Sequence, residues 1–180
     1  MFFAAAEGCG EDVEYVSAIG SRISLSERTH WLSRSFYDAV SDIIELKEVT
    51  RLHNNLQHLN TSRLQHSVNV SYYSFLAALV LGANARAAAR AGLLHDLYYY
   101  DYKDAGLSVR EHSARHSEMA LQNAKTITNV SVIEEDAIVS HMWPITKGNP
   151  KYIEGIIVTF ADKYCTILEV TSKVLQKLIR

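Results

Sequence analysis

Hydrophobic residues recur at steps of three and four along most of the chain, which is the spacing of one face of an α-helix. Alternating apolar and polar runs closed by a glycine-containing two-residue turn, which would indicate β-hairpins, are absent from the sequence. Only eight glycines and two prolines interrupt the helical pattern. The chain is therefore predicted to be all-α. The expected helices cover residues 27–59 (continuous, or broken at 50–55), 62–81, 85–97, 108–125 (or from 113), 131–141 and 150–178.

The regular pattern begins near residue 29, and the chain before it follows no clear period. Residues 1–28 are therefore predicted to be irregular or loosely helical, and residues 29–180 to form a single helical domain. A length of 180 residues, of which 48% are hydrophobic, suits one domain with a sizeable core.

Charge and cysteine content narrow the class of protein. The net charge is −2 and the basic residues are spread along the chain, which disfavours a nucleic-acid polymer as partner. The two cysteines, Cys9 and Cys165, lie near opposite ends and form no disulfide framework. The sequence shows neither the charged start of a signal peptide nor an uninterrupted apolar run of membrane-spanning length. We expect a soluble, cytoplasmic protein that does not associate with membranes.

Four of the eight histidines fall on the apolar face of their predicted helix, where polar side chains are uncommon. For His66, this face is predicted to continue through Val70, Tyr73, Ala77 and Val80. A single inward histidine is more often a core residue than a metal ligand. Four of them on successive helices, all near helix ends, fit that interpretation poorly. The four are His66, His95, His116 and His141.

Two aspartates interrupt strongly apolar segments in the same way. Asp96 lies in GLLHDLYYY, and Asp162 lies in IIVTFADKYCTIL. The neighbour Lys163 is a poor partner for Asp162, because adjacent helical residues do not face each other. An unpaired buried charge costs about 3–5 kcal/mol. A metal cation would neutralise these carboxylates and would accept neutral imidazole as a ligand.

The stretches RLQHSVNVS (63–71), AARAGLLHDL (88–97) and VTFADKYC (158–165) resemble the HD-domain superfamily of metal-dependent phosphohydrolases, over residues of about 60–170. The resemblance implies an all-α helical bundle of the HD-domain type. His116 in RHSEMALQNA and His141 in IVSHMWP resemble the further ligands of the dinuclear branch. One metal would then be held by His66, His95, Asp96 and Asp162, and Asp96 would bridge to a second metal at His116 and His141.

One position in this set has an alternative. Ser117 and Ala120 stand where the family more often has proline and glycine, and His112 lies one turn before His116 on the same face. His116 is favoured as the ligand because an apolar stripe follows it. His112 is then a candidate to face the substrate.

The resemblance also implies a reaction. We expect hydrolysis of a phosphoester or phosphoanhydride in a small phosphorylated substrate, most simply a nucleotide, by a metal-activated hydroxide that Asp96 orients. The nitrogen-rich ligand set favours Fe, Mn, Zn, Co or Ni over the oxygen-preferring Mg²⁺ and Ca²⁺. The side chains predicted to bind the substrate phosphate are Arg63 and Lys163, each of which is equally readily a solvated surface charge. His112 is a further candidate to face the substrate, and Lys147 and Arg115 are weaker candidates that are more readily surface charges.

Two other functions remain open at this level. Some proteins of the HD fold use a similar six-ligand set as a di-iron oxygenase, and a non-catalytic helical sensor or interaction module would keep the fold alone. A homodimer through the apolar tail at residues 169–179 is also an expectation, with packing inside one chain as the alternative.

Overall fold

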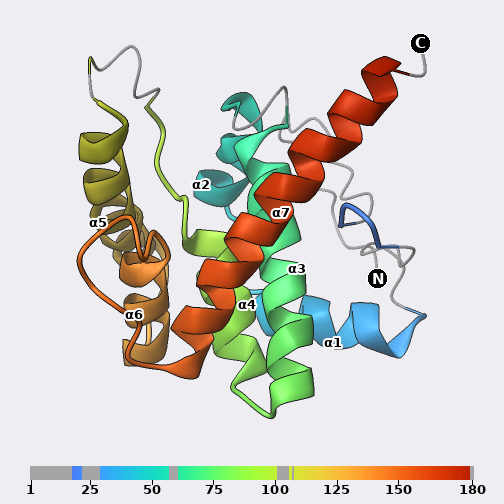
Figure 1. The fold of residues 1–180 in the computed structure, drawn as a ribbon. Coiled ribbons are helices and arrows are strands. Elements are labelled where there is room, and N and C mark those ends of the chain that lie inside the picture. The colour runs from blue at the N-terminus through green and yellow to red at the C-terminus, as the bar shows by residue number, and fades with distance from the viewer. Residues whose placement is uncertain (1–17, 22–28, 57–60, 101–105, 107, 179–180) are drawn as a thin grey trace, which may run out of the picture.

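The computed structural model of the chain (Figure 1) describes residues 18–21, 29–56, 61–100, 106 and 108–178. Within these ranges the regular structure is helical, apart from an isolated β-bridge between Leu56 and Ser62. The prediction of an all-α fold is confirmed. Most of the segment predicted to be irregular, residues 1–28, lies outside the described residues. The elements are α1 (Trp31–Val40), α2 (Lys47–Thr50), η1 (Arg51–Asn54), α3 (Arg63–Leu81), α4 (Ala85–Leu94), α5 (Val109–Ile127), α6 (Val132–Ser140) and α7 (Ile153–Leu178).

The prediction of one continuous helix over residues 27–59 is wrong, and the alternative break at 50–55 is correct only in part, since α2 ends at Thr50 and η1 at Asn54 while an earlier break follows α1. The chain leaves the helical conformation after α1, extends at Leu46 (φ −64°, ψ 139°), and continues as the short elements α2 and η1. Helical spacing within each piece is the same whether or not the pieces are joined. Apolar periodicity therefore did not reveal the break between α1 and α2.

Serine caps account for the starts of three helices. Ser62 accepts a hydrogen bond from the backbone of Gln65 at the start of α3. Capping boxes begin α5 and α6: the side chains of Ser108 and Ser131 each accept from the backbone three residues later, where a glutamate side chain accepts from the serine's own backbone N–H. Helix α5 therefore starts at the earlier of its two predicted positions. Helix α4 is three residues shorter than predicted, since His95 is already its C-cap.

Helix α4 lies at the centre of the bundle. It packs against α3 and α1, and against α6 and α7 on its other sides, so that α7 crosses in front of the α3–α4 pair in Figure 1. Most of its side chains are small and buried, including Ala88, Ala91 and Gly92. Small residues allow this many neighbours to approach one short helix.

Helices α3 and α4 approach each other to backbone contact at one point. A Cβ on Gly92 would lie 2.8 Å from the Cα atom of Ser71 and 3.0 Å from its backbone nitrogen. The hydroxyl of Ser71 donates to the carbonyl of Ala89 at 2.7 Å. Because the two helices form a hairpin, this crossing brings the start of α3, with His66, beside the end of α4, with His95.

The inward stripe predicted for α3 is correct at one end only. His66 and Val70 are fully buried, whereas Val80 is 86% exposed. Helix α3 extends beyond the helices that pack against it, so its last turn is exposed to solvent. Among the described residues, every helix is too short or too polar to cross a lipid bilayer.

Candidate metal centre

The structure brings the six predicted ligands to one region of the interior, although they come from five separate helical segments. Five of the six side chains are buried, and that of Asp162 is 15% exposed. Two of the segments contribute their ligands from the residues directly after the last helical turn. The positions are His66 in α3, His95 and Asp96 after α4, His116 in α5, His141 after α6 and Asp162 in α7.

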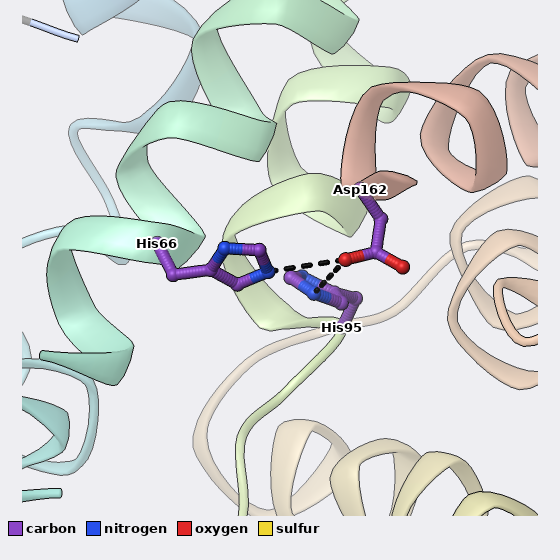
Figure 2. Close-up of side chains that lie close together, drawn as sticks. All are labelled: His66, His95 and Asp162. Atoms are coloured by element: carbon purple, nitrogen blue, oxygen red, sulfur yellow. Dashed lines mark hydrogen bonds and ion pairs between the residues drawn. The ribbon is translucent and has the colours of Figure 1, made fainter. Parts of the chain in front are cut away.

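The first group of ligands consists of His66, His95 and Asp162, drawn in Figure 2. The Nε2 atom of His66 lies 3.1 Å from Oδ1 of Asp162, and the Nε2 atom of His95 lies 3.8 Å from the same oxygen. Candidate ligand atoms of all three residues lie within 4.8 Å of one another. Figure 2 shows both imidazoles directed at a single carboxylate oxygen.

The second group of ligands consists of His116 and His141, which lie beside Asp96. The Oδ1 atom of Asp96 is 3.4 Å from Nε2 of His116 and 3.8 Å from Nε2 of His141. Its Oδ2 atom is 3.6 Å from Nε2 of His95, which belongs to the first group. The two oxygens of one carboxylate therefore face two different sets of histidines, which is the placement a bridging ligand needs.

Three of these histidines are oriented by a hydrogen bond at Nδ1, the ring nitrogen that faces away from the centre. The Nδ1 atoms of His95, His116 and His141 lie 2.8, 2.9 and 2.7 Å from the backbone carbonyls of Gly92, His112 and Ile138. A carbonyl only accepts, so each Nδ1 carries the proton and Nε2 is the ring nitrogen directed into the centre. Histidines that bind metals in proteins are oriented in the same way.

The donor set is suited to a cation. The Nε2 atoms of His116 and His141 lie 2.9 Å apart, and Nε2 of His95 has no hydrogen-bond partner among the described residues. Burial lowers the pKa of His141 to about 3, and the neighbouring imidazoles add to the effect, so a second proton on this ring is disfavoured. Burial alone would raise the pKa of Asp96, but the surrounding histidines hold it well below its usual range. Lone pairs and an ionised carboxylate that converge in this way fit divalent metal ions.

His66 differs from the other three histidines because both of its ring nitrogens meet carboxylates. Burial would lower its pKa, but the hydrogen bonds to Asp162 and Glu169 outweigh burial and raise the pKa to about 10. Burial alone would raise the pKa of Asp162, and the hydrogen bond with His66 instead lowers it to about 2. Without a metal, His66 is therefore a protonated link between two carboxylates. A metal would replace the proton on Nε2, since ligand atoms must be deprotonated.

Glu169 is a residue of this centre that the sequence interpretation missed. Its carboxylate is fully buried, and its two oxygens lie 3.0 and 3.1 Å from Nδ1 of His66. Asn69 holds the same carboxylate by donating from Nδ2 at 2.8 Å. The available signal was an acidic residue in the apolar run TILEV, seven residues after Asp162 and therefore on the same face of α7. Glu169 orients His66 and makes its Nε2 a stronger donor to a metal.

We therefore expect Glu169→Gln to weaken metal binding. The amide keeps the shape of the side chain and loses its charge, and the loss of such outer partners costs roughly 10- to 100-fold in metal affinity. Competition with a chelator of known affinity measures this change directly. Glu118→Gln, on the exposed side of α5, is the matched control and should leave the affinity unchanged. Equal metal affinities in the two variants would show that Glu169 does not contribute to the metal centre.

His112 lies beside the ligands and faces tyrosines. Its ring stacks on that of His116 at 4.6 Å between centroids, and its Nδ1 and Nε2 atoms lie 3.1 and 3.4 Å from the hydroxyls of Tyr100 and Tyr98. Arg63 belongs to the same cluster, because it donates to the carbonyl of Tyr98 at 2.6 Å and covers the Tyr98 ring at 3.7 Å. The geometry therefore places His116, and not His112, among the converging nitrogens.

The two predicted lysines lie in different surroundings. Lys163 is half-buried beside Asp162 and donates from Nζ to the carbonyls of His141 and Thr159, each at 3.2 Å. Lys147 is exposed in the segment after α6 and lines a surface hollow to which none of the six ligands contributes. Arg115, a weaker candidate like Lys147, is exposed on α5. The structure thus brings Lys163 to the centre and leaves Lys147 away from it.

Comparison with known proteins places this geometry in a family. A family model described as the HD domain matches residues 63–167, which is more than half of the chain and includes all six converging ligands. No solved structure matches the chain. HD domains are typical of metal-dependent phosphohydrolases and bind divalent metals, as the resemblance in the sequence implied. The matched range and the all-helical fold together show that this chain belongs to the HD-domain family.

Proposed function

We propose that this protein hydrolyses a phosphoester or phosphoanhydride bond of a small phosphorylated substrate of the nucleotide type, with two divalent transition metals bound at the centre. The observation that supports this proposal is the position of Asp96, whose Oδ2 faces His95 while its Oδ1 faces His116 and His141. A carboxylate shared in this way between two groups of ligands suits two neighbouring metal ions. It is not needed for a single structural metal.

The two groups of ligands divide the metals between them. His66, His95, Asp96 and Asp162 would hold one ion, and Asp96, His116 and His141 would hold the other. Bound metals would supply Lewis acidity toward a phosphoryl oxygen and would lower the pKa of a coordinated water. The nitrogen-rich donor set favours Fe, Mn, Zn, Co or Ni. The carbonyl bonds at Nδ1 keep the imidazoles oriented for this role.

Lys163 is the cation best placed for the substrate phosphate. Its ammonium group has three N–H donors, and two of them reach the carbonyls of His141 and Thr159. The third can donate to a phosphoryl oxygen next to Asp162. Burial lowers the pKa of Lys163, while the charge of Asp162 opposes this effect.

The aromatic surface beside His116 supports a nucleotide as substrate. The rings of Tyr98 and His112 lie 5.4 and 4.6 Å from that of His116, and Tyr100 packs against both of these rings. Tyr100 and His112 are half-buried, so part of each ring faces outward. A flat base could stack on such a surface while its phosphate reaches the metals.

Elemental analysis of the purified protein, followed by phosphate release from a panel of nucleotides, tests the proposal. We expect a first-row transition metal at about two ions per chain and metal-dependent hydrolysis of at least one compound, equally in air and without oxygen. Turnover that requires oxygen and iron would instead support the oxygenase reading. An intact protein that binds no transition metal would support a non-catalytic helical module. Either result contradicts the proposal.

Lys163→Met separates substrate binding from metal binding. Loss of a charged hydrogen bond is expected to lower kcat/KM roughly 10- to 100-fold while the metal content stays unchanged. Steady-state kinetics and elemental analysis on the same preparations measure the two effects. Lys151→Met, at an exposed position before α7, serves as the control and should match the wild type. Unchanged kinetics in the Lys163 variant would exclude this lysine as a substrate contact.

A further inference from the structure

We propose that α7 forms the interface of a homodimer, in which an apolar stripe on its outer face pairs with the same stripe of a second copy of this chain. We call this set of side chains the outer stripe. Each of its members is at least 44% exposed, and the most exposed are Phe160 and Ile167, at 60% and 61%. The members are Ile153, Ile156, Phe160, Tyr164, Ile167 and Val174.

The outer stripe is not needed for the core of the bundle, apart from Tyr164, whose ring packs edge-on against Tyr73 of α3 at 5.2 Å between centroids. The opposite face of α7 already buries Val158, Ala161 and Cys165, and it carries Asp162 and Glu169 to the metal centre. Helix α7 is therefore apolar on both sides. A helix that is hydrophobic all round is normally covered on both sides. In Figure 1 no other labelled helix lies over the outer side of α7.

The spacing of the stripe identifies the kind of partner. Ile153, Phe160, Ile167 and Val174 are seven residues apart, so they stay on one line along the helix. Apolar residues with this repeat are typical of a helix that pairs lengthwise with another helix. The other positions of the outer stripe, together with the exposed Thr171, are also uncharged. Two copies of α7 can therefore face each other without placing like charges in contact.

The area of the outer stripe is sufficient for such a pair. A large side chain carries roughly 150–250 Å² of surface, so six of them at about half exposure present on the order of 600 Å². This value is at the upper end of what monomers expose. Pairing two copies would remove about 1,200 Å² from solvent, which is the lower limit of stable, specific interfaces. A two-fold contact uses the same surface on both copies, so a second copy is the simplest partner.

Sedimentation velocity of the full chain over a concentration series tests the proposal, together with two separate variants, Phe160→Glu and Ile167→Glu. We expect the wild type to sediment as a dimer of the 20.2 kDa chain. A charge at the centre of the stripe should weaken the dimer about 30-fold or more. Trp31→Glu is the matched control, because Trp31 is 66% exposed but lies on α1. This variant should remain a dimer.

Several results would overturn the proposal. A wild type that stays monomeric at every concentration would mean that another segment or another protein covers the stripe. A dimer that survives both glutamate substitutions would place the interface elsewhere. Circular dichroism confirms that each variant keeps its helical content. If a glutamate variant unfolds, Phe160→Ser and Ile167→Ser replace it, and the same outcomes decide.

Discussion

Asp96→Ala is expected to abolish metal retention and phosphate release together. Of the two aspartates in the ligand set, Asp96 is the one whose oxygens face both groups of histidines. Its oxygens lie 3.4 to 3.8 Å from the Nε2 atoms of these histidines. Its removal takes a ligand from each proposed metal and leaves three imidazoles, those of His95, His116 and His141, without the anion that they share. We expect a fall of more than about 100-fold in metal affinity, beyond the 10- to 100-fold typical of outer partners.

Elemental analysis, calorimetric titration with metal and a phosphate-release assay measure this effect. Thermal unfolding adds a readout independent of activity, because metal at 100 times its dissociation constant stabilises the folded state by about 2.7 kcal/mol. A chelator should therefore destabilise the wild type and leave Asp96→Ala unaffected. Asp38→Ala, at an exposed position of α1, should behave as the wild type does. Full activity of the Asp96 variant would refute the assignment of the centre.

Gly92→Ala is expected to destabilise the fold although alanine is the better helix former. In an exposed helix this substitution would gain about 1 kcal/mol. Here the added Cβ would lie 2.8 Å from the Cα atom of Ser71, a backbone atom that cannot move alone. Separating α3 from α4 in a packed core costs about 1–3 kcal/mol. The same shift would move His95 away from His66, so metal affinity should fall as well.

The sign of the change in the free energy of unfolding of Gly92→Ala shows whether helix packing or helix propensity dominates at this position. Urea unfolding of the metal-free protein gives the stability difference, and chelator competition gives the affinity. Ala114→Gly, at an exposed position of α5, is the control for propensity and should cost about 1 kcal/mol. If Gly92→Ala stabilises the protein, the two helices do not meet at their backbones as described.

The sequence was sufficient for the class of fold and the family. Helical periodicity and the scarcity of glycine and proline indicated an all-α chain, and the serine caps marked the starts of α3, α5 and α6. These signals are local, since they depend on residues three or four positions apart. The features that the sequence did not predict are also those that local spacing cannot report. The break between α1 and α2 could not be predicted from the apolar spacing, and Val80 keeps the helical pattern although it is exposed.

The residue types of the candidate centre were also visible in the sequence, because a histidine or aspartate on an apolar face needs a partner wherever that face is buried. The tertiary structure decided how these residues divide. In the folded chain the two oxygens of Asp96 face different histidines, and His116 rather than His112 points inward. Glu169 lies against His66 although 103 residues separate them in sequence. The close approach of Gly92 to Ser71 lets α3 and α4 pack tightly, which brings His66 beside His95. Such contacts join helices that are distant in sequence, so no local pattern specifies them. The sequence identified the groups that a cation would neutralise, and the packing of the helices decided which of them lie together.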